Sequence, residues 1–315
     1  MPALENFHSR FPLAHTFSIV ARDPESGEMG VAVQSHWFSV GSVVAWGKPG
    51  IGVVATQSMV EVSYGPRGLA LMEMGIPAPA ALQTLLEIDE GRELRQVAMI
   101  DCENRLGVHT GKRCIQAAGH VRGDGFSVQA NMMVNDQVWP AMAEAFTGTK
   151  GSLVERMMAA MDAAQAVGGD IRGQQSASLL VVSGKRPENP WQGVLIDLRV
   201  EDHPEPLKEL RRLITIQSAY TLMNQGDAYL GEGNVAGALD AYSAAAALAP
   251  DMDELPFWHA VTLAELGRME EAEPIFIRVF QINSGWADLV QRLPAAGLLR
   301  DDADLLARIQ ALKSD

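Results

Sequence analysis

The chain has 315 residues, of which 47% are apolar and 20% are charged, which excludes a disordered protein and allows two domains with separate cores. Its formal net charge of −14 argues against a protein that mainly binds nucleic acid, because such proteins need basic surface. Residues 201–315 carry 19 acidic and 9 basic side chains, against 20 and 16 in residues 1–200, so a domain boundary is expected near residue 200.

Strands are predicted at the beginning of the chain. Residues 16–22 and 29–35 are rich in β-formers and flank a turn of Asp, Pro, Ser and Gly, which predicts a hairpin. Residues 42–46 and 51–56 predict a second pair of strands around Gly-Lys-Pro-Gly. Residues 51–56 are apolar on both faces, so this strand is expected to be covered on both sides.

Helices and strands then follow in blocks. One helix is expected to begin near Pro66, and a second over residues 77–89, where the apolar spacing is helical. The remaining predicted elements are strands at 95–101, 105–110 and 125–133, a helix that Pro140 interrupts, a helix at 153–167, and strands at 176–184 and 191–200. Because β-α-β alternation is absent, this order favours antiparallel sheets with helices outside them.

The last third of the chain repeats itself every 34 residues. Positions that recur at this spacing are Gly233 and Gly267, Ala238 and Ala272, and Tyr242 and Phe276. This is the tetratricopeptide period, and it predicts helical hairpins. Two such units seldom bury a complete core, so flanking helices at 205–218 and 300–313 are expected to cap them.

Common catalytic and cofactor motifs are missing. The segment from Gly50 to Ala55 matches the loose dinucleotide fingerprint, but no helix start follows it. The seven histidines include no i, i+4 pair, so neither a metal nor another cofactor is expected. The two cysteines, Cys102 and Cys114, fit a reducing cytoplasm. The first fifteen residues lack the apolar segment of a secretory signal, and no apolar run is long enough to span a membrane. These features predict a cytoplasmic protein.

Four segments carry a resemblance to a known family. They are HTFSIVARDPESGEMGVAVQSHWFSVG, ATQSMVEVSYGPRGL, GDGFSVQANMM and GGDIRGQQSASLLVV. Block for block, they resemble domain-of-unknown-function family ten-twenty-eight, which is regarded as similar to N-terminal-nucleophile hydrolases. The resemblance implies an α+β fold with a four-layer α/β/β/α sandwich over residues 16–200. An extension over 1–15 precedes it, and the all-α domain that the 34-residue period predicts follows over 201–315.

The resemblance also implies a mechanism. In the superfamily the first residue of the mature chain attacks an amide carbonyl, and its own α-amino group, with a pKa of about 7.7–8.0, takes the proton. Thr16 occupies the matching position, but fifteen residues precede it, so it can act only after the bond between His15 and Thr16 is cut. The alternative is that Thr16 is an ordinary β-branched strand residue.

Further site residues follow from the same resemblance and from strand alternation. His36 and Asp170 are expected near the nucleophile, and the expected substrate or oxyanion contacts are Ser35, Gln57, Ser58, Arg67, Gln129, Asn131, Arg172 and Ser176. Gln129 and Asn131 would point to one sheet face and line a polar cleft. Arg67, at a helix start, would suit a carboxylate. The alternatives are a surface histidine at His36, a solvated Arg67, and a structural ion pair between Asp170 and Arg172.

Two functions remain open. The first is a hydrolase that acts on a C–N bond other than a peptide bond in a small, anionic substrate, with Thr16 as nucleophile. The second is a non-catalytic binding or scaffold protein that uses the sandwich cleft and the helical repeats to hold a protein partner. A homodimer is expected, and neither nucleic acid nor a membrane is an expected partner.

Overall fold

The computed structural model describes residues 13–14 and 16–313. The chain forms two compact units that divide after Arg211, inside helix α6 (Pro206–Gly231). The composition change near residue 200 falls at the end of the last strand, before this helix begins.

Two antiparallel sheets form the first unit. The five-stranded sheet has the order β1-β5-β6-β7, with β4 also paired to β5, and the six-stranded sheet has the order β11-β10-β3-β2-β9-β8. The five-stranded sheet contains β1 (Leu13–Ala14), β4 (Ala45–Lys48), β5 (Gly52–Met59), β6 (Arg95–Asp101) and β7 (Leu106–Thr110). The six-stranded sheet contains β2 (Thr16–Arg22), β3 (Met29–Ser35), β8 (Gly119–Gly123), β9 (Phe126–Ala130), β10 (Ser176–Val182) and β11 (Val194–Val200).

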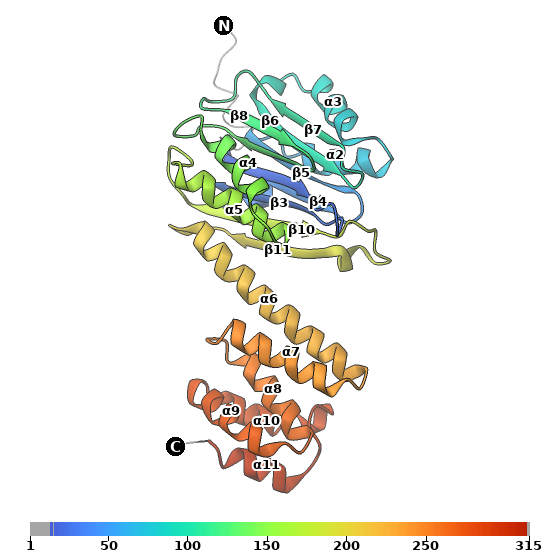
Figure 1. Cartoon of the computed structure of the whole chain (residues 1–315), viewed down its shortest axis with the longest axis vertical. Coiled ribbons are helices and arrows are strands. Elements are labelled where there is room, and N and C mark those ends of the chain that lie inside the picture. Colours follow the sequence, from blue (N-terminus) through green and yellow to red (C-terminus); the bar gives the residue numbers. More distant parts are fainter. Residues whose placement is uncertain (1–12, 15, 314–315) are drawn as a thin grey trace. The chain divides into compact units, whose positions relative to one another are not determined.

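Helices cover the outer face of each sheet (Figure 1). Helices α2 (Tyr64–Glu73) and α3 (Ala78–Ile88) pack on the five-stranded sheet, and α4 (Val138–Gly148) and α5 (Leu153–Ala166) pack on the six-stranded sheet. Between the sheets lies an apolar core to which Val20, Val31 and Val33 contribute from one side and Val53 and Ala55 from the other. The predicted four-layer α/β/β/α sandwich is therefore confirmed.

Two local predictions were wrong. Residues 42–46 do not form one strand, because a short helix, α1 (Gly41–Val44), precedes β4. The Ser42 hydroxyl donates to the Ser39 carbonyl at 2.7 Å, and such local bonds favour a turn over a strand. Pro140 does not interrupt a helix either: it lies in the first turn of α4, where the missing N–H has no helical partner to lose.

The second unit is all helical, as the repeat predicted. Its helices are the rest of α6, α7 (Val235–Leu248), α8 (Glu254–Glu265), α9 (Met269–Ile282), α10 (Gly285–Val290) and α11 (Ala303–Gln310). Gly233 and Gly267 both adopt φ of +76° before α7 and α9, a left-handed turn that glycine allows without strain. The predicted flanking helix at 205–218 does not end there, because α6 runs on unbroken through Gly231.

The repeat positions supply the core of the second unit. Tyr242 and Phe276, one period apart, are both fully buried, and Phe276 packs edge-on against Phe257. None of the helices in the described part of the chain combines the length and apolar composition that crossing a bilayer requires.

Candidate functional site

Three hydroxyl side chains form a row at one end of the six-stranded sheet. Thr16 on β2 pairs with Ser35 on β3, which pairs in turn with Ser176 on β10. Residues directly opposite each other on neighbouring strands project to the same face. All three residues are fully buried. The register thus brings together three of the residues that the sequence placed at the site.

The main chain of Thr16 is held by two more of the expected residues. Its carbonyl oxygen accepts hydrogen bonds from the Asn131 backbone N–H at 3.1 Å and from the Asn131 Nδ2 at 3.4 Å. The Gln57 Nε2, which comes from the opposite sheet, donates to the same oxygen at 3.2 Å. Both sheets therefore fix the position of Thr16.

These contacts belong to a larger polar cluster between the sheets. The buried polar cluster comprises Ser18, Gln57, Gln96, Gln129 and Asn131, all fully buried. Ser18 donates to Gln57 at 2.6 Å and accepts from Gln129 at 2.6 Å. The Gln96 Oε1 accepts from Gln57 at 2.7 Å and from Asn131 at 3.0 Å. Because a buried amide left unpaired costs about 1–3 kcal/mol, such a cluster specifies one alignment of the two sheets.

A loop before β10 closes the same end of the sheet. The Asp170 carboxylate accepts from the His36 backbone N–H at 3.2 Å and forms an ion pair with Arg172 at 2.7 Å. The Ser176 hydroxyl accepts from the Val40 N–H at 3.0 Å. Asp170 and Ser176 thus anchor the segment that follows β3. The imidazole of His36 is exposed, with Nδ1 3.3 Å from the Gln174 carbonyl oxygen.

The chain that leads into Thr16 is part of the five-stranded sheet. Leu13 pairs with Met59, and Ala14 pairs with Ser58, so β1 lies on β5 immediately before the chain crosses to the other sheet. Ser58 is buried and adopts a positive φ of 76°, which is unusual for a residue with a side chain. His15 and residues 1–12, where the predicted extension and cleavage position lie, fall outside the described residues.

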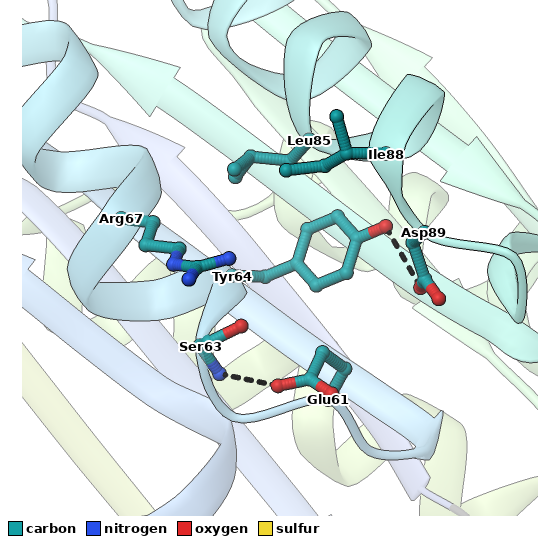
Figure 2. A pocket seen from close by; sticks show the side chains of 7 residues that line it. All are labelled: Glu61, Ser63, Tyr64, Arg67, Leu85, Ile88 and Asp89. Atoms are coloured by element: carbon teal, nitrogen blue, oxygen red, sulfur yellow. Dashed lines mark hydrogen bonds between the residues drawn. The ribbon is translucent and has the colours of Figure 1, made fainter.

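Arg67 lies in a different place from the other predicted residues. It lines a cavity of about 370 Å³ with Glu61, Ser63, Tyr64, Leu85, Ile88 and Asp89 (Figure 2). The Gln96 side chain of β6 points into the buried polar cluster, whereas its neighbour Arg95 bonds Asp89 at this cavity. Since neighbouring strand residues point to opposite faces, the cavity lies on the outer face of the five-stranded sheet and Thr16 lies on its inner side.

Sequence reasoning missed several members of these groups. Ser18 and Gln96 complete the polar cluster, and each is a polar residue inside an otherwise apolar strand. Tyr64 and Asp89 line the outer cavity, and Arg95 donates a hydrogen bond to Asp89. A polar residue that points inward from a buried strand was the signal that could have identified Ser18 and Gln96. Their hydrogen-bond partners could not be predicted, because these depend on how the two sheets stack.

Comparisons with known proteins place both parts of the chain. A family described as "Family of unknown function (DUF1028)" matches residues 16–210, and a tetratricopeptide repeat family matches residues 229–296. The crystal structure of protein SPO2555 from Silicibacter pomeroyi, described with the same family of unknown function, is similar, with a TM-score of 0.58 and 30% identity. The similarity covers 64% of this chain and 85% of that one. No curated protein matches the chain.

Proposed function

The chain belongs to the DUF1028 family of unknown function, and we propose that its sandwich is an amide-bond hydrolase whose nucleophile, Thr16, is freed by cleavage of the preceding bond. One observation carries the proposal: Thr16 begins a central strand, and side chains from both sheets fix its carbonyl oxygen. The row of Thr16, Ser35 and Ser176 puts hydroxyl groups at one sheet end, beside the loop of Asp170.

The proposed reaction has two steps. In the first, the Thr16 Oγ1 attacks the amide carbonyl carbon, and the freed α-amino group of Thr16 takes the hydroxyl proton. The C–N bond then breaks as this proton passes to the leaving amine, which gives an ester on Thr16. In the second, water adds to the ester, and its collapse releases a carboxylic acid and restores the threonine. Backbone N–H groups are the expected oxyanion donors.

The substrate is expected to be small and anionic. Arg172 is the expected contact for the anionic group: its guanidinium pairs with the Asp170 carboxylate, but 26% of its side chain is exposed. Arg67, the other cation that the sequence suggested, lies on the far side of the five-stranded sheet and takes no part in this mechanism.

The intact chain should be inactive. While residue 15 remains attached, the nitrogen of Thr16 is an amide, which has no basic lone pair, and Thr16 is fully buried. Strand β1 is paired to β5, so Leu13 and Ala14 belong to the folded sandwich. Cleavage before Thr16 would free its α-amino group to act as the base, and removal of the preceding residues would expose the Thr16 side chain.

The first prediction concerns this cleavage. Purified protein is analysed by intact mass and N-terminal sequencing, and release of nitroaniline from glutaryl-p-nitroanilide, an anionic amide, is followed in parallel. We expect hydrolysis only in chains that begin at Thr16. Thr16→Ala should abolish it, because the hydroxyl is lost, whereas Thr16→Ser should retain part of it. A chain that keeps the preceding residues and hydrolyses the probe equally well with Thr16→Ala would refute the nucleophile assignment.

A second candidate function is a non-catalytic binding protein. The tetratricopeptide match over residues 229–296 favours it, together with the complete burial of Thr16 in the uncut chain. In that case the helical repeats would hold a protein partner, and the sandwich would serve as a rigid support. Stable retention of the residues before Thr16, with no amide hydrolysis under any condition, is the result that would favour this alternative.

A further inference from the structure

The cavity around Arg67 has the size and position of a small-molecule site. Its volume of about 370 Å³ lies in the range of about 300–1,000 Å³ that is usual for ligand pockets. It opens between α2 and α3 on the outer face of the five-stranded sheet, and Figure 2 shows the side chains that surround it. The lining combines one cation, two carboxylates, two hydroxyl groups and an apolar wall.

One wall of this cavity is rigidly built. The buried Arg95 donates from Nε to Asp89 at 2.8 Å and from Nη1 to the Met59 carbonyl at 2.7 Å. Asp89 also accepts from the Gly91 N–H at 2.8 Å and from the Tyr64 hydroxyl at 3.1 Å. Burial and the neighbouring Asp89 raise the pKa of Tyr64, so it remains a neutral phenol. The charge of Asp89 is thus already balanced by Arg95.

Two further charges face the cavity without pairing with each other. In the part of the chain that the structure describes, no ion pair or side-chain hydrogen bond engages the Arg67 guanidinium. Among the described residues, the Glu61 carboxylate accepts one hydrogen bond, from the Ser63 backbone N–H at 3.1 Å, which leaves its second oxygen available. One cation and one anion therefore line the same small cavity and remain open to a ligand.

An apolar surface completes the lining. Leu85 is buried, and Ile88, one turn further along α3, is 67% exposed although it is a large apolar residue. Both side chains lie on the same side of the Tyr64 ring in Figure 2, away from Glu61 and Ser63. A short apolar group of a ligand would cover them and remove this surface from water.

We propose that this cavity binds a small zwitterion of the apolar α-amino acid class. Its carboxylate would pair with the planar guanidinium of Arg67, which suits two parallel hydrogen bonds. Its ammonium would pair with the open oxygen of Glu61, and its side chain would lie on Leu85 and Ile88. The site is separate from Thr16 and does not depend on amide hydrolysis, because the body of the sheet lies between them.

The test is calorimetric titration of the full-length protein with L-leucine as the probe. We expect saturable binding at millimolar concentration or below. Leucinamide, which lacks the carboxylate charge, and N-acetyl-leucine, which lacks the ammonium charge, should each bind about tenfold or more weakly, because each loses a charge-assisted hydrogen bond. Glycine, which lacks the apolar side chain, should also bind more weakly.

Matched variants assign the binding to this cavity. Arg67→Gln and Glu61→Gln should each weaken L-leucine binding about tenfold or more. Arg113→Gln and Glu90→Gln change exposed residues of the same charge outside the cavity, and they should leave the affinity for L-leucine unchanged. Thr16→Ala should also bind normally, which separates this proposal from the hydrolase. No saturable binding of L-leucine, or equal affinity in Arg67→Gln, would overturn it.

Discussion

The Asp89 carboxylate joins three elements through its hydrogen bonds. Its partners are Arg95 at the start of β6, the Gly91 backbone, and the Tyr64 hydroxyl at the start of α2. Burial disfavours its charge, but the hydrogen bonds from Arg95 and Gly91 outweigh this and lower the pKa of Asp89 below its usual range. Asp89 is therefore expected to stabilise the fold in its ionised form.

Asp89→Asn should accordingly destabilise the protein by about 3 kcal/mol at neutral pH, because the negative charge that faces the buried Arg95 is lost. An acid whose pKa is lowered by folding stabilises the folded state fully above its unfolded-state pKa, which is about 3.9 for Asp. This contribution to the free energy of unfolding is lost as the pH falls through the lowered folded-state pKa. In urea unfolding, the difference in the free energy of unfolding between the unmutated protein and Asp89→Asn should thus shrink below about pH 4. Asp197→Asn, at an exposed ion pair with Arg199, should cost less than about 1 kcal/mol. Equal losses would contradict this account.

Individual site residues could be predicted where one strand sufficed. Alternation along residues 125–133 was enough to place Gln129 and Asn131 on one face, and the structure has both in the buried polar cluster. Ser18 and Gln96 were not predicted, because their hydrogen-bond partners lie on other strands. Which strands come into contact depends on how the two sheets stack. Arg67 was grouped with Thr16 although it faces the other side, since sequence proximity to β5 does not reveal which face a helix covers.

At the scale of elements, α2 approaches the five-stranded sheet very closely. A Cβ at Gly65 would lie 2.3 Å from the Trp46 ring, so only glycine fits where this helix meets β4. The Trp46 ring cannot easily move, because its indole N–H donates to the Val43 carbonyl at 3.0 Å. Gly65 therefore sets the distance between the helix and the sheet that it covers.

Gly65→Ala should destabilise the protein by about 1–3 kcal/mol through overpacking against Trp46. Gly148→Ala is the matched control, because a Cβ there would meet open space at the end of α4. That change should be neutral or slightly stabilising, by up to about 1 kcal/mol. Thermal unfolding of both variants provides the measurement. A loss at Gly148 as large as that at Gly65 would show that packing is not the cause.

Hydrophobic periodicity was enough to predict the type of most elements. One wrong prediction has a local cause, and one missed strand has a tertiary cause. The apolar run at 42–46 is β-like in composition, but Ser42 bonds back to Ser39 and the chain turns into α1 instead. Strand β8 was not predicted, because glycine, histidine and arginine in Gly119–Gly123 give it no apolar pattern. It is a strand because β9 pairs with it, which is a tertiary effect.

At the scale of the whole molecule, the chain is two compact units with separate cores. The excess of acidic residues beyond residue 200 and the 34-residue period both predicted a second domain. The position of the division, after Arg211, could not be predicted, because one continuous helix, α6, belongs to both units. Its sequence carries no break at that point.

Separate cores predict separate unfolding. Phe276 is fully buried against Phe257 in the second unit, so Phe276→Ala should destabilise that unit by about 3–5 kcal/mol. The neighbouring Ile277 is 37% exposed, and Ile277→Ala should cost only about 1 kcal/mol or less. Circular dichroism in the far ultraviolet should show an earlier helical transition, while hydrogen exchange of the backbone amides in β2 and β3 should be unchanged. One joint shift of all signals would argue that the units unfold together.

Adjacent residues of strand β6 serve the two sites. Arg95 holds Asp89, which lines the outer cavity, and Gln96 belongs to the buried polar cluster. Insertion or deletion of a single residue within β6 would exchange its two faces, so that an arginine would point between the sheets and a glutamine toward α2 and α3. Both sites would fail in the same step. Among natural or engineered variants of this protein, the segment 95–101 should therefore tolerate some substitutions but no insertion or deletion. The exposed turn after Asp23 should tolerate both substitutions and changes of length.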